Sequence, residues 1–183
     1  MKRIACLGSG NGEPGDKMYD AMQEVGKLLA KNGITVLTGG FGGSGMEAPA
    51  KGVQSSGGKS VGFTLMGIPG NQYLSETVDT KKQSDIPEIQ FGIRLGNLLS
   101  ADGFIISADG GAGTMTELMA IINLNAKFWK PSKPVVILNH YQEEDGYPIG
   151  DILHSLKKWG MLPDSVKVEV VFSPEKAVKL LLG

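Results

Sequence analysis

The segment from Ser107 to Glu117 combines the groups that an anion-binding site needs. It reads Ser-Ala-Asp-Gly-Gly-Ala-Gly-Thr-Met-Thr-Glu and joins a short apolar run to a segment with helical spacing. Backbone N–H groups of a glycine-rich turn that opens a helix converge on one point and bind an anion without a basic side chain. The pattern therefore predicts a phosphate or nucleotide site built from Gly110, Gly111, Gly113, Thr114 and Thr116.

Thr114 and Glu117 add side-chain chemistry to this segment. We expect Thr114 to cap the helix and to donate its hydroxyl to a phosphate oxygen. Glu117 follows three residues later, on the same helical face. A carboxylate in the first turn also stabilises a helix dipole, which is one interpretation of Glu117. The other places Glu117 beside the sugar of a bound ligand, where it orients water or stabilises a cation.

The elements that must position these groups alternate along the chain. Six apolar runs, rich in β-branched residues, are typical of parallel strands covered on both faces. They are 4–7, 34–37, 61–65, 104–106, 135–138 and 166–172. Helical patterns lie between them, over about 16–33, 46–56, 87–101, 114–128 and 149–159, with a last helix opening at Ser173-Pro174-Glu175. This alternation predicts an α/β fold, a doubly wound, Rossmann-like parallel sheet sandwiched by helices, as a single domain over residues 1–183.

Two capping features support the first helix of this pattern. Asp16 precedes it as the expected N-cap, and Gly33 follows it as the closing residue.

An acidic run precedes the fifth predicted helix. Glu143–Asp145, beside Gly146, is typical of a solvated turn.

Glycine is the composition's most unusual feature: the chain has 27 in 183 residues, about twice the usual ~7 %. Fourteen of them follow the first four predicted strands. Ligands of doubly wound sheets bind at the carboxyl ends of the strands. We therefore add the loops after the first two strands to the predicted binding site, through Gly8, Ser9, Gly39 and Gly40.

Two nucleotide-binding motifs fit poorly. Gly8–Glu13 resembles a dinucleotide fingerprint, but its third glycine comes one place early and no acidic residue ends the second strand. Gly57-Gly58-Lys59-Ser60 imitates the end of a Walker A loop, yet a strand pattern follows it where a helix should begin. A dehydrogenase and a P-loop nucleotide hydrolase are both disfavoured.

Charge and composition limit the classes of partner that the protein is expected to bind. The net charge of −1 argues against a nucleic acid polymer. No apolar run approaches the ~20 residues that span a bilayer, so no membrane partner is expected. Cys6 is the one cysteine, which fits a reducing, cytoplasmic location, and its apolar neighbours predict a buried thiol. His140 and His154 are isolated, so we predict no metal site and no cofactor.

Gly110-Gly111-Ala112-Gly113-Thr114-x-x-Glu117 resembles the PGGxGTxxE signature of the LOG-type, so-called lysine decarboxylase-like, Rossmann family. That family includes cytokinin riboside monophosphate phosphoribohydrolases and molybdenum cofactor carrier-like proteins. Thr38–Met46 is similar to the family's second glycine loop and Gly8-Ser9 to its first. Arg94, sixteen residues before Gly110, matches the family's catalytic arginine. Asp109 stands in place of the signature proline, and Leu95 in place of the lysine of active hydrolases.

The resemblance implies a nucleoside 5′-monophosphate phosphoribohydrolase that releases free base and ribose 5-phosphate. In that reading Gly110–Thr114 anchor the phosphate, and Glu117 stabilises the ribosyl cation or positions water. Arg94 holds phosphate or sugar oxygens and orients Glu117. The alternative is a non-catalytic carrier or sensor of a phosphorylated ligand, and Arg94 could also form a surface ion pair. The resemblance further implies a homodimer or larger homo-oligomer. An acidic Asp109 next to a phosphate is unfavourable unless its side chain turns away.

Overall fold

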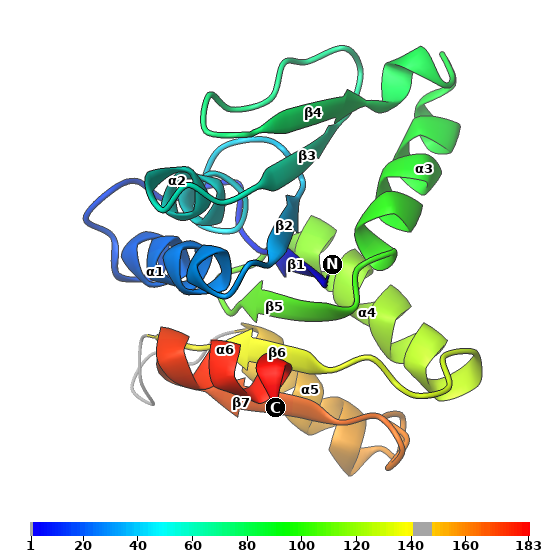
Figure 1. The fold of residues 1–183 in the computed structure, drawn as a ribbon. Coiled ribbons are helices and arrows are strands. Elements are labelled where there is room, and N and C mark those ends of the chain that lie inside the picture. Colours follow the sequence, from blue (N-terminus) through cyan, green and yellow to red (C-terminus); the bar gives the residue numbers. More distant parts are fainter. Residues whose placement is uncertain (1, 141–147) are drawn as a thin grey trace.

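The chain is built around one parallel sheet (Figure 1). The computed structural model describes residues 2–140 and 148–183. Among these, seven strands pair in the order β4-β3-β2-β1-β5-β6-β7, and every pair is parallel. The strands are β1 (Arg3–Leu7), β2 (Thr35–Thr38), β3 (Ser60–Thr64), β4 (Glu76–Asp79), β5 (Gly103–Ser107), β6 (Val135–Leu138) and β7 (Val168–Val171). The order reverses between β1 and β5, so a ligand is expected at the carboxyl ends of these two strands.

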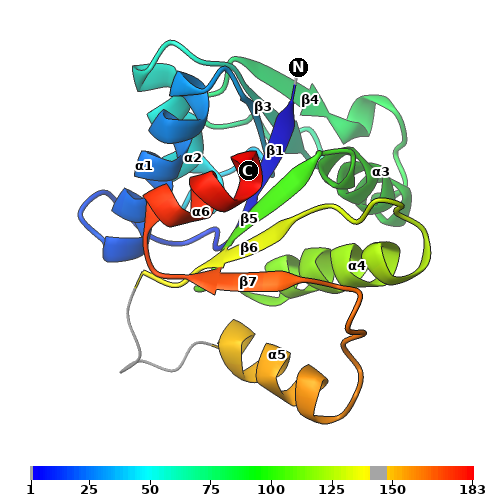
Figure 2. The ribbon, with the colours of Figure 1, turned by 60° about the horizontal axis from the view of Figure 1, so that its bottom comes forward.

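Helices cover both faces of the sheet. They are α1 (Lys17–Lys31), α2 (Glu47–Ser55), α3 (Pro87–Leu99), α4 (Ala112–Lys127), α5 (Pro148–Lys158) and α6 (Pro174–Leu182), with a short 3₁₀ turn η1 (Thr80–Lys82). Figure 2 shows α1, α2 and α6 on one face, and α3, α4 and α5 on the other. None of the helices in the described residues is long and apolar enough to cross a membrane.

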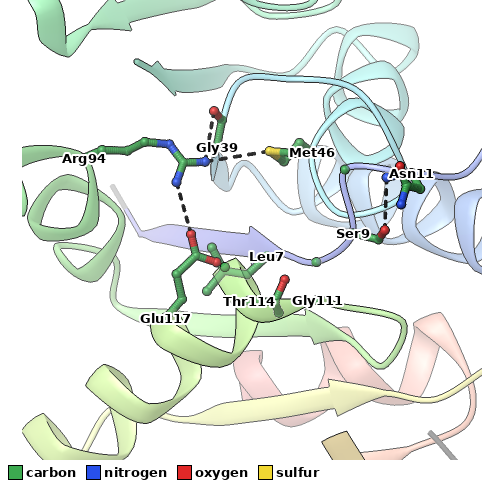
Figure 3. Close-up of a pocket in the computed structure, with 12 residues that line it drawn as sticks. Leu7, Ser9, Asn11, Gly39, Met46, Arg94, Gly111, Thr114 and Glu117 are labelled. Carbon is green, nitrogen blue, oxygen red and sulfur yellow. Dashed lines mark hydrogen bonds and ion pairs between the residues drawn. The ribbon is translucent and has the colours of Figure 1, made fainter. Parts of the chain in front are cut away.

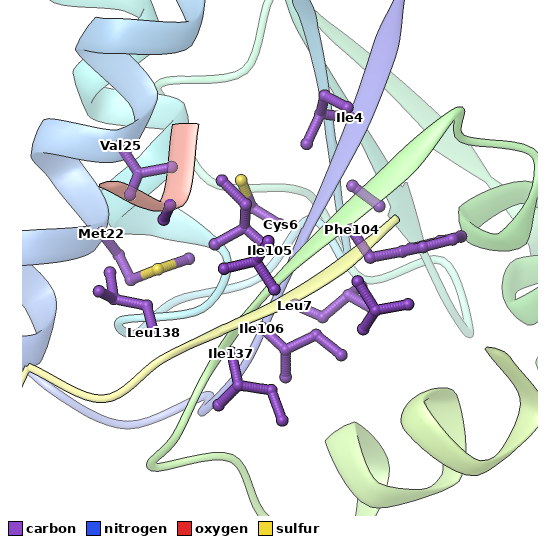
Figure 4. Packing of buried hydrophobic residues seen from close by; sticks show 14 of the residues in the cluster. Ile4, Cys6, Leu7, Met22, Val25, Phe104, Ile105, Ile106, Ile137 and Leu138 are labelled. Atoms are coloured by element: carbon purple, nitrogen blue, oxygen red, sulfur yellow. The ribbon is translucent and has the colours of Figure 1, made fainter. Parts of the chain in front are cut away.

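The central strands are buried, apart from Arg3 at the start of β1, because helices lie on both sides of them (Figure 4). Ile4, Cys6, Ile105 and Ile137 all lie in this core. Cys6 is fully buried, and burial raises the pKa of its thiol to about 12. The predicted burial of this thiol is thus confirmed.

The predicted fold class is confirmed, and the predicted strands and helices all appear with shifts of a few residues at their ends. Ser60 begins the strand β3. The sequence predicted a strand here, whereas a Walker A loop would be followed by a helix. The edge strand β4 was not predicted. Its four residues, Glu-Thr-Val-Asp, contain a single apolar side chain and are half-buried or exposed, so they give no hydrophobic signal.

Of the two N-cap predictions, the one for Asp16 is confirmed in position and the one for Thr114 is wrong. Asp16 occupies the N-cap position of α1, but its carboxylate accepts from the backbone N–H of Glu13 at 2.8 Å instead of from the helix. Thr114 does not cap α4, because the helix already begins at Ala112 with Gly111 as N-cap. Gly33 does close α1, with the positive φ of 69° that favours glycine there. The acidic run Glu143–Asp145 lies outside the described residues.

Candidate functional site

A pocket of about 240 Å³ lies where three loops meet at the carboxyl edge of the sheet (Figure 3). We name them the β1 loop (residues 8–16), the β2 loop (39–46) and the β5 loop (108–111), after the strands they follow. Arg94 of α3 and the first turns of α4 complete the walls. The lining residues are Leu7, Gly8, Ser9, Gly10, Asn11, Gly39, Met46, Arg94, Gly111, Gly113, Thr114 and Glu117.

The amino end of α4 supplies backbone donors to this pocket. The first bond of the helix runs from the N–H of Met115 to the carbonyl of Gly111, at 3.0 Å. The N–H groups of residues 112–114 therefore have no acceptor within the helix. Gly111, Gly113 and Thr114 all line the pocket. Together with the helix dipole, these groups favour an anion at this end of the pocket.

Arg94 and Glu117 form an ion pair at the other end, with Nη1 of Arg94 3.4 Å from Oε1 of Glu117. Their side chains are only 13 % and 10 % exposed. Arg94 also donates from Nε to the carbonyl of Phe63 at 2.8 Å and from Nη2 to the carbonyl of Gly39 at 3.2 Å. The guanidinium therefore joins β3, the β2 loop and α4, and it fixes the Glu117 carboxylate against the pocket (Figure 3). This excludes a surface ion pair as the role of Arg94.

Burial dominates the electrostatics of this pair. Desolvation raises the pKa of the Glu117 carboxyl, and the charge and hydrogen bond of Arg94 lower it only in part. Desolvation likewise lowers the pKa of Arg94, and Glu117 opposes that shift. Arg94 stays protonated at neutral pH even so, because a guanidinium does not lose its proton in proteins. A carboxylate with a raised pKa in a pocket is a recurrent feature of sites that move protons or stabilise cations.

Close approach of the three loops depends on glycines without side chains. A Cβ on Gly8 would overlap the hydroxyl of Ser107 and the backbone of Gly45, and a Cβ on Gly39 would overlap the guanidinium of Arg94. Larger residues at either position would push the loops apart and displace the arginine.

The structure brings most of the predicted site residues to one pocket. Those that line it are Glu117, Arg94, Gly111, Gly113, Thr114, Gly8, Ser9 and Gly39. Their roles as catalytic or binding groups stay predictions.

Three predicted residues do not line the pocket. Gly110 lies under the side chain of Thr114, where a Cβ would overlap it. The hydroxyl of Thr116 is exposed and donates back to the carbonyl of Ala112 at 2.9 Å. Gly40 has a φ of 84° and turns its carbonyl to the N–H of Asn71, at 2.8 Å. These residues shape the loops around the pocket instead.

Four lining residues were not predicted: Leu7, Gly10, Asn11 and Met46. Leu7 and the two loop residues flank Gly8 and Ser9, so extending the predicted β1 loop by a residue or two each way would have found them. Met46 ends the segment that resembles the family's second glycine loop, but its side chain was not assigned to the site. Its sulfur lies 3.8 Å from Nη2 of Arg94.

The part of the chain that the structure describes contains no cluster of three His, Cys, Asp or Glu side chains able to hold a metal. His140, one of the two histidines, has its Nδ1 3.0 Å from the carbonyl of Phe172.

Comparisons with known proteins agree with this fold. The protein TM1055 has a solved structure with a TM-score of 0.73, is 28 % identical, and is matched over 100 % of this chain and 99 % of its own. The Moco carrier protein of Chlamydomonas reinhardtii has a TM-score of 0.66 at 25 % identity, over 99 % of this chain and 97 % of its own. An uncharacterized protein of Archaeoglobus fulgidus is 29 % identical over 142 residues, which are 75 % of this chain and 84 % of that protein. Residues 1–149 match the SLOG cluster4 family, and the chain therefore belongs to that family.

Proposed function

We propose that the pocket binds a nucleoside 5′-monophosphate and hydrolyses its N-glycosidic bond. The observation that carries this proposal is the Glu117 carboxylate, which Arg94 holds within the same pocket as the free N–H groups of α4. The phosphate would be anchored by Gly111, Gly113 and Thr114, and the sugar would lie between the phosphate and Glu117.

The reaction adds water across the bond between the ribose C1′ and the base nitrogen. As that bond breaks, the base leaves with the electron pair and takes a proton, and C1′ acquires oxocarbenium character. A nearby carboxylate stabilises this cation and accepts a proton from the attacking water. The products are free base and ribose 5-phosphate, so atoms and charge balance without a cofactor.

A second candidate function is a non-catalytic carrier or sensor of a phosphorylated ligand. Two observations favour it: Leu95 stands where the active hydrolases have lysine, and the similar Chlamydomonas protein is a Moco carrier. Backbone N–H groups and a buried ion pair would hold a phosphorylated ligand equally well without turnover.

An assay of base release from AMP distinguishes the hydrolase from the carrier. For a hydrolase, we expect the purified protein to release adenine, and Glu117→Gln to lower kcat by about a hundredfold or more, the usual contribution of a positioned acid–base group. AMP binding by calorimetry should survive this substitution. AMP binding without base release in the wild-type protein would support the carrier and overturn the hydrolase. A hydrolase whose rate is unchanged in Glu117→Gln would overturn the role of Glu117.

We also propose that the protein works as a homodimer or larger homo-oligomer, with α3 at the contact between copies. Helix α3 carries Arg94 and, in its first turns, exposed apolar side chains such as Ile89 and Phe91. A contact through Phe91, three residues before Arg94, would border the pocket.

A further inference from the structure

Asp109 is the charged residue of the β5 loop. The proposed chemistry does not use it, and its carboxylate does not line the pocket. One oxygen, Oδ1, accepts from the hydroxyl of Ser107 at 2.6 Å, within the same stretch of chain. The other, Oδ2, accepts from the hydroxyl of Ser44 at 2.6 Å, in the β2 loop sixty-five residues away. The side chain thus turns away from the anion site, as the sequence required.

Ser44 is the point where this carboxylate reaches the other two loops. It is fully buried, and its backbone N–H donates to the carbonyl of Asn11 at 2.8 Å. The next N–H, of Gly45, donates to the carbonyl of Ser9 at 3.0 Å. A single short, charge-assisted hydrogen bond from Ser44 therefore connects the β5 loop to the β2 loop, which is bonded in turn to the β1 loop.

The position of the β1 and β2 loops relative to the amino end of α4 depends on this connection. The β1 and β2 loops contribute Gly8, Ser9, Gly39 and Met46 to the walls, whereas the anion-binding N–H groups belong to α4. A hydrogen bond between a charged and a neutral group contributes more to stability than one between two neutral groups. Preorganised donors bind without the cost of ordering a loop.

We propose that Asp109 is a positioning residue that ties the β2 loop to the β5 loop through Ser44 and so keeps the three loops in their binding arrangement. This inference rests on the proposed function for its ligand. It does not rest on it for its structural consequence, because the state of the loops can be measured without ligand.

The two serines provide a matched pair of variants. Ser44→Ala and Ser107→Ala each remove one hydroxyl bonded to Asp109 at the same distance, but only Ser44 joins different loops. In hydrogen exchange we expect the amides of Ser44 and Gly45 to exchange about tenfold faster or more in Ser44→Ala and in Asp109→Ala. In Ser107→Ala they should exchange as in the wild-type protein. Asp109→Asn, which keeps an acceptor oxygen, should lie between Asp109→Ala and the wild type.

A ligand readout separates positioning from general destabilisation. We expect Ser44→Ala and Asp109→Ala to weaken AMP binding about tenfold. If the protein is a hydrolase, KM should rise while kcat stays close to the wild-type value, because the loops bind ground state and transition state alike. Asp164→Ala, at an exposed aspartate on the α5–β7 connection, is the control and should change none of these quantities.

The outcomes are distinct from those of the hydrolase test. Unchanged exchange in Ser44→Ala, or equal disturbance by Ser44→Ala and Ser107→Ala, overturns the positioning role whatever the activity. Faster exchange confined to Ser44→Ala and the Asp109 variants supports the role even when the wild-type protein releases no base, a result that overturns only the hydrolase.

Discussion

Arg94 shows how one side chain organises the site at the scale of residues. A guanidinium carries five N–H groups in a fixed plane. Those of Arg94 reach the carbonyls of Phe63 and Gly39 and the carboxylate of Glu117. Lysine could not reproduce this arrangement, because its ammonium is a point charge without the planar fork. The arginine thus acts mainly by placing Glu117, and the carboxylate is the group free to meet a ligand.

The raised pKa of Glu117 predicts the pH dependence of base release. Burial raises this pKa, and Arg94 lowers it in part. If the ionised carboxylate is the active form, activity is lost as pH falls through that pKa, so the acid limb of kcat/KM lies above the usual glutamate value of ~4.3. Replacing Arg94 removes the lowering contribution. In Arg94→Gln we expect the limb to move to still higher pH.

The control for this prediction is Arg3→Gln, since Arg3 is exposed on β1 and bonds to the carbonyl of Ser100. Its acid limb should coincide with that of the wild-type protein. Because the measured quantity is the position of the limb, a lower absolute rate in Arg94→Gln does not affect the comparison. A limb at the same pH in wild type and Arg94→Gln would contradict the assignment of Glu117 as the titrating group.

At the scale of elements, glycines set how closely α1 and α2 approach each other. A Cβ on Gly26 of α1 would overlap the carbonyl of Pro49, and a Cβ on Gly52 of α2 would overlap the carbonyl of Gln23. Each helix thus presents a glycine to the backbone of the other. Since α2 begins directly after the β2 loop, this packing also fixes the end of that loop. The glycine excess therefore serves helix packing as well as the close approach of the loops around the pocket.

Gly26→Ala tests this packing. We expect it to lower the free energy of unfolding by about 1–3 kcal/mol, the usual cost of overpacking, because the obstacle is backbone and cannot rotate away. Gly150→Ala is the matched control, since Gly150 lies in α5 with open space around it. There alanine should stabilise the helix by up to ~1 kcal/mol. Urea unfolding with an unchanged m-value measures both changes. Equal effects at the two positions would show that α1 and α2 have room to separate.

Elements with an apolar signal could be predicted, and those without one could not. The runs at 4–7 and 135–138 became β1 and β6 because buried parallel strands require continuous apolar residues. The edge strand β4 pairs with one neighbour only and is polar. The site divides in the same way. The glycine loops and Glu117 follow from local pattern, whereas the contacts of Met46 with Arg94 and of Asp109 with Ser44 join positions forty-eight and sixty-five residues apart. No local pattern specifies them.

At the scale of the whole molecule, exposed apolar side chains gather where β3 ends and α3 begins. They are Met66, Ile68, Ile86, Ile89 and Phe91. A shallow depression lined by Met66, Pro87 and Phe91 lies among them. Gly92 and Gly96 of the same helix have open space around them, so another element could approach its backbone closely. Exposed apolar side chains grouped in this way mark partner contacts, and the commonest partner is a second copy related by a twofold axis.

Phe91→Glu tests whether this surface joins two copies. Light scattering of the wild-type protein should give at least twice the chain mass of 19.3 kDa. A buried, unpaired carboxylate at the contact is strongly unfavourable, so Phe91→Glu should shift the mass to that of one chain. Phe172→Glu is the matched control, because Phe172 is also exposed but follows β7, at the opposite edge of the sheet. A monomeric wild-type protein would overturn the proposed oligomer, and dissociation by Phe172→Glu alone would place the contact elsewhere. Since Arg94 lies one turn along α3 from Phe91, dissociation should also change AMP affinity if the contact supports the pocket.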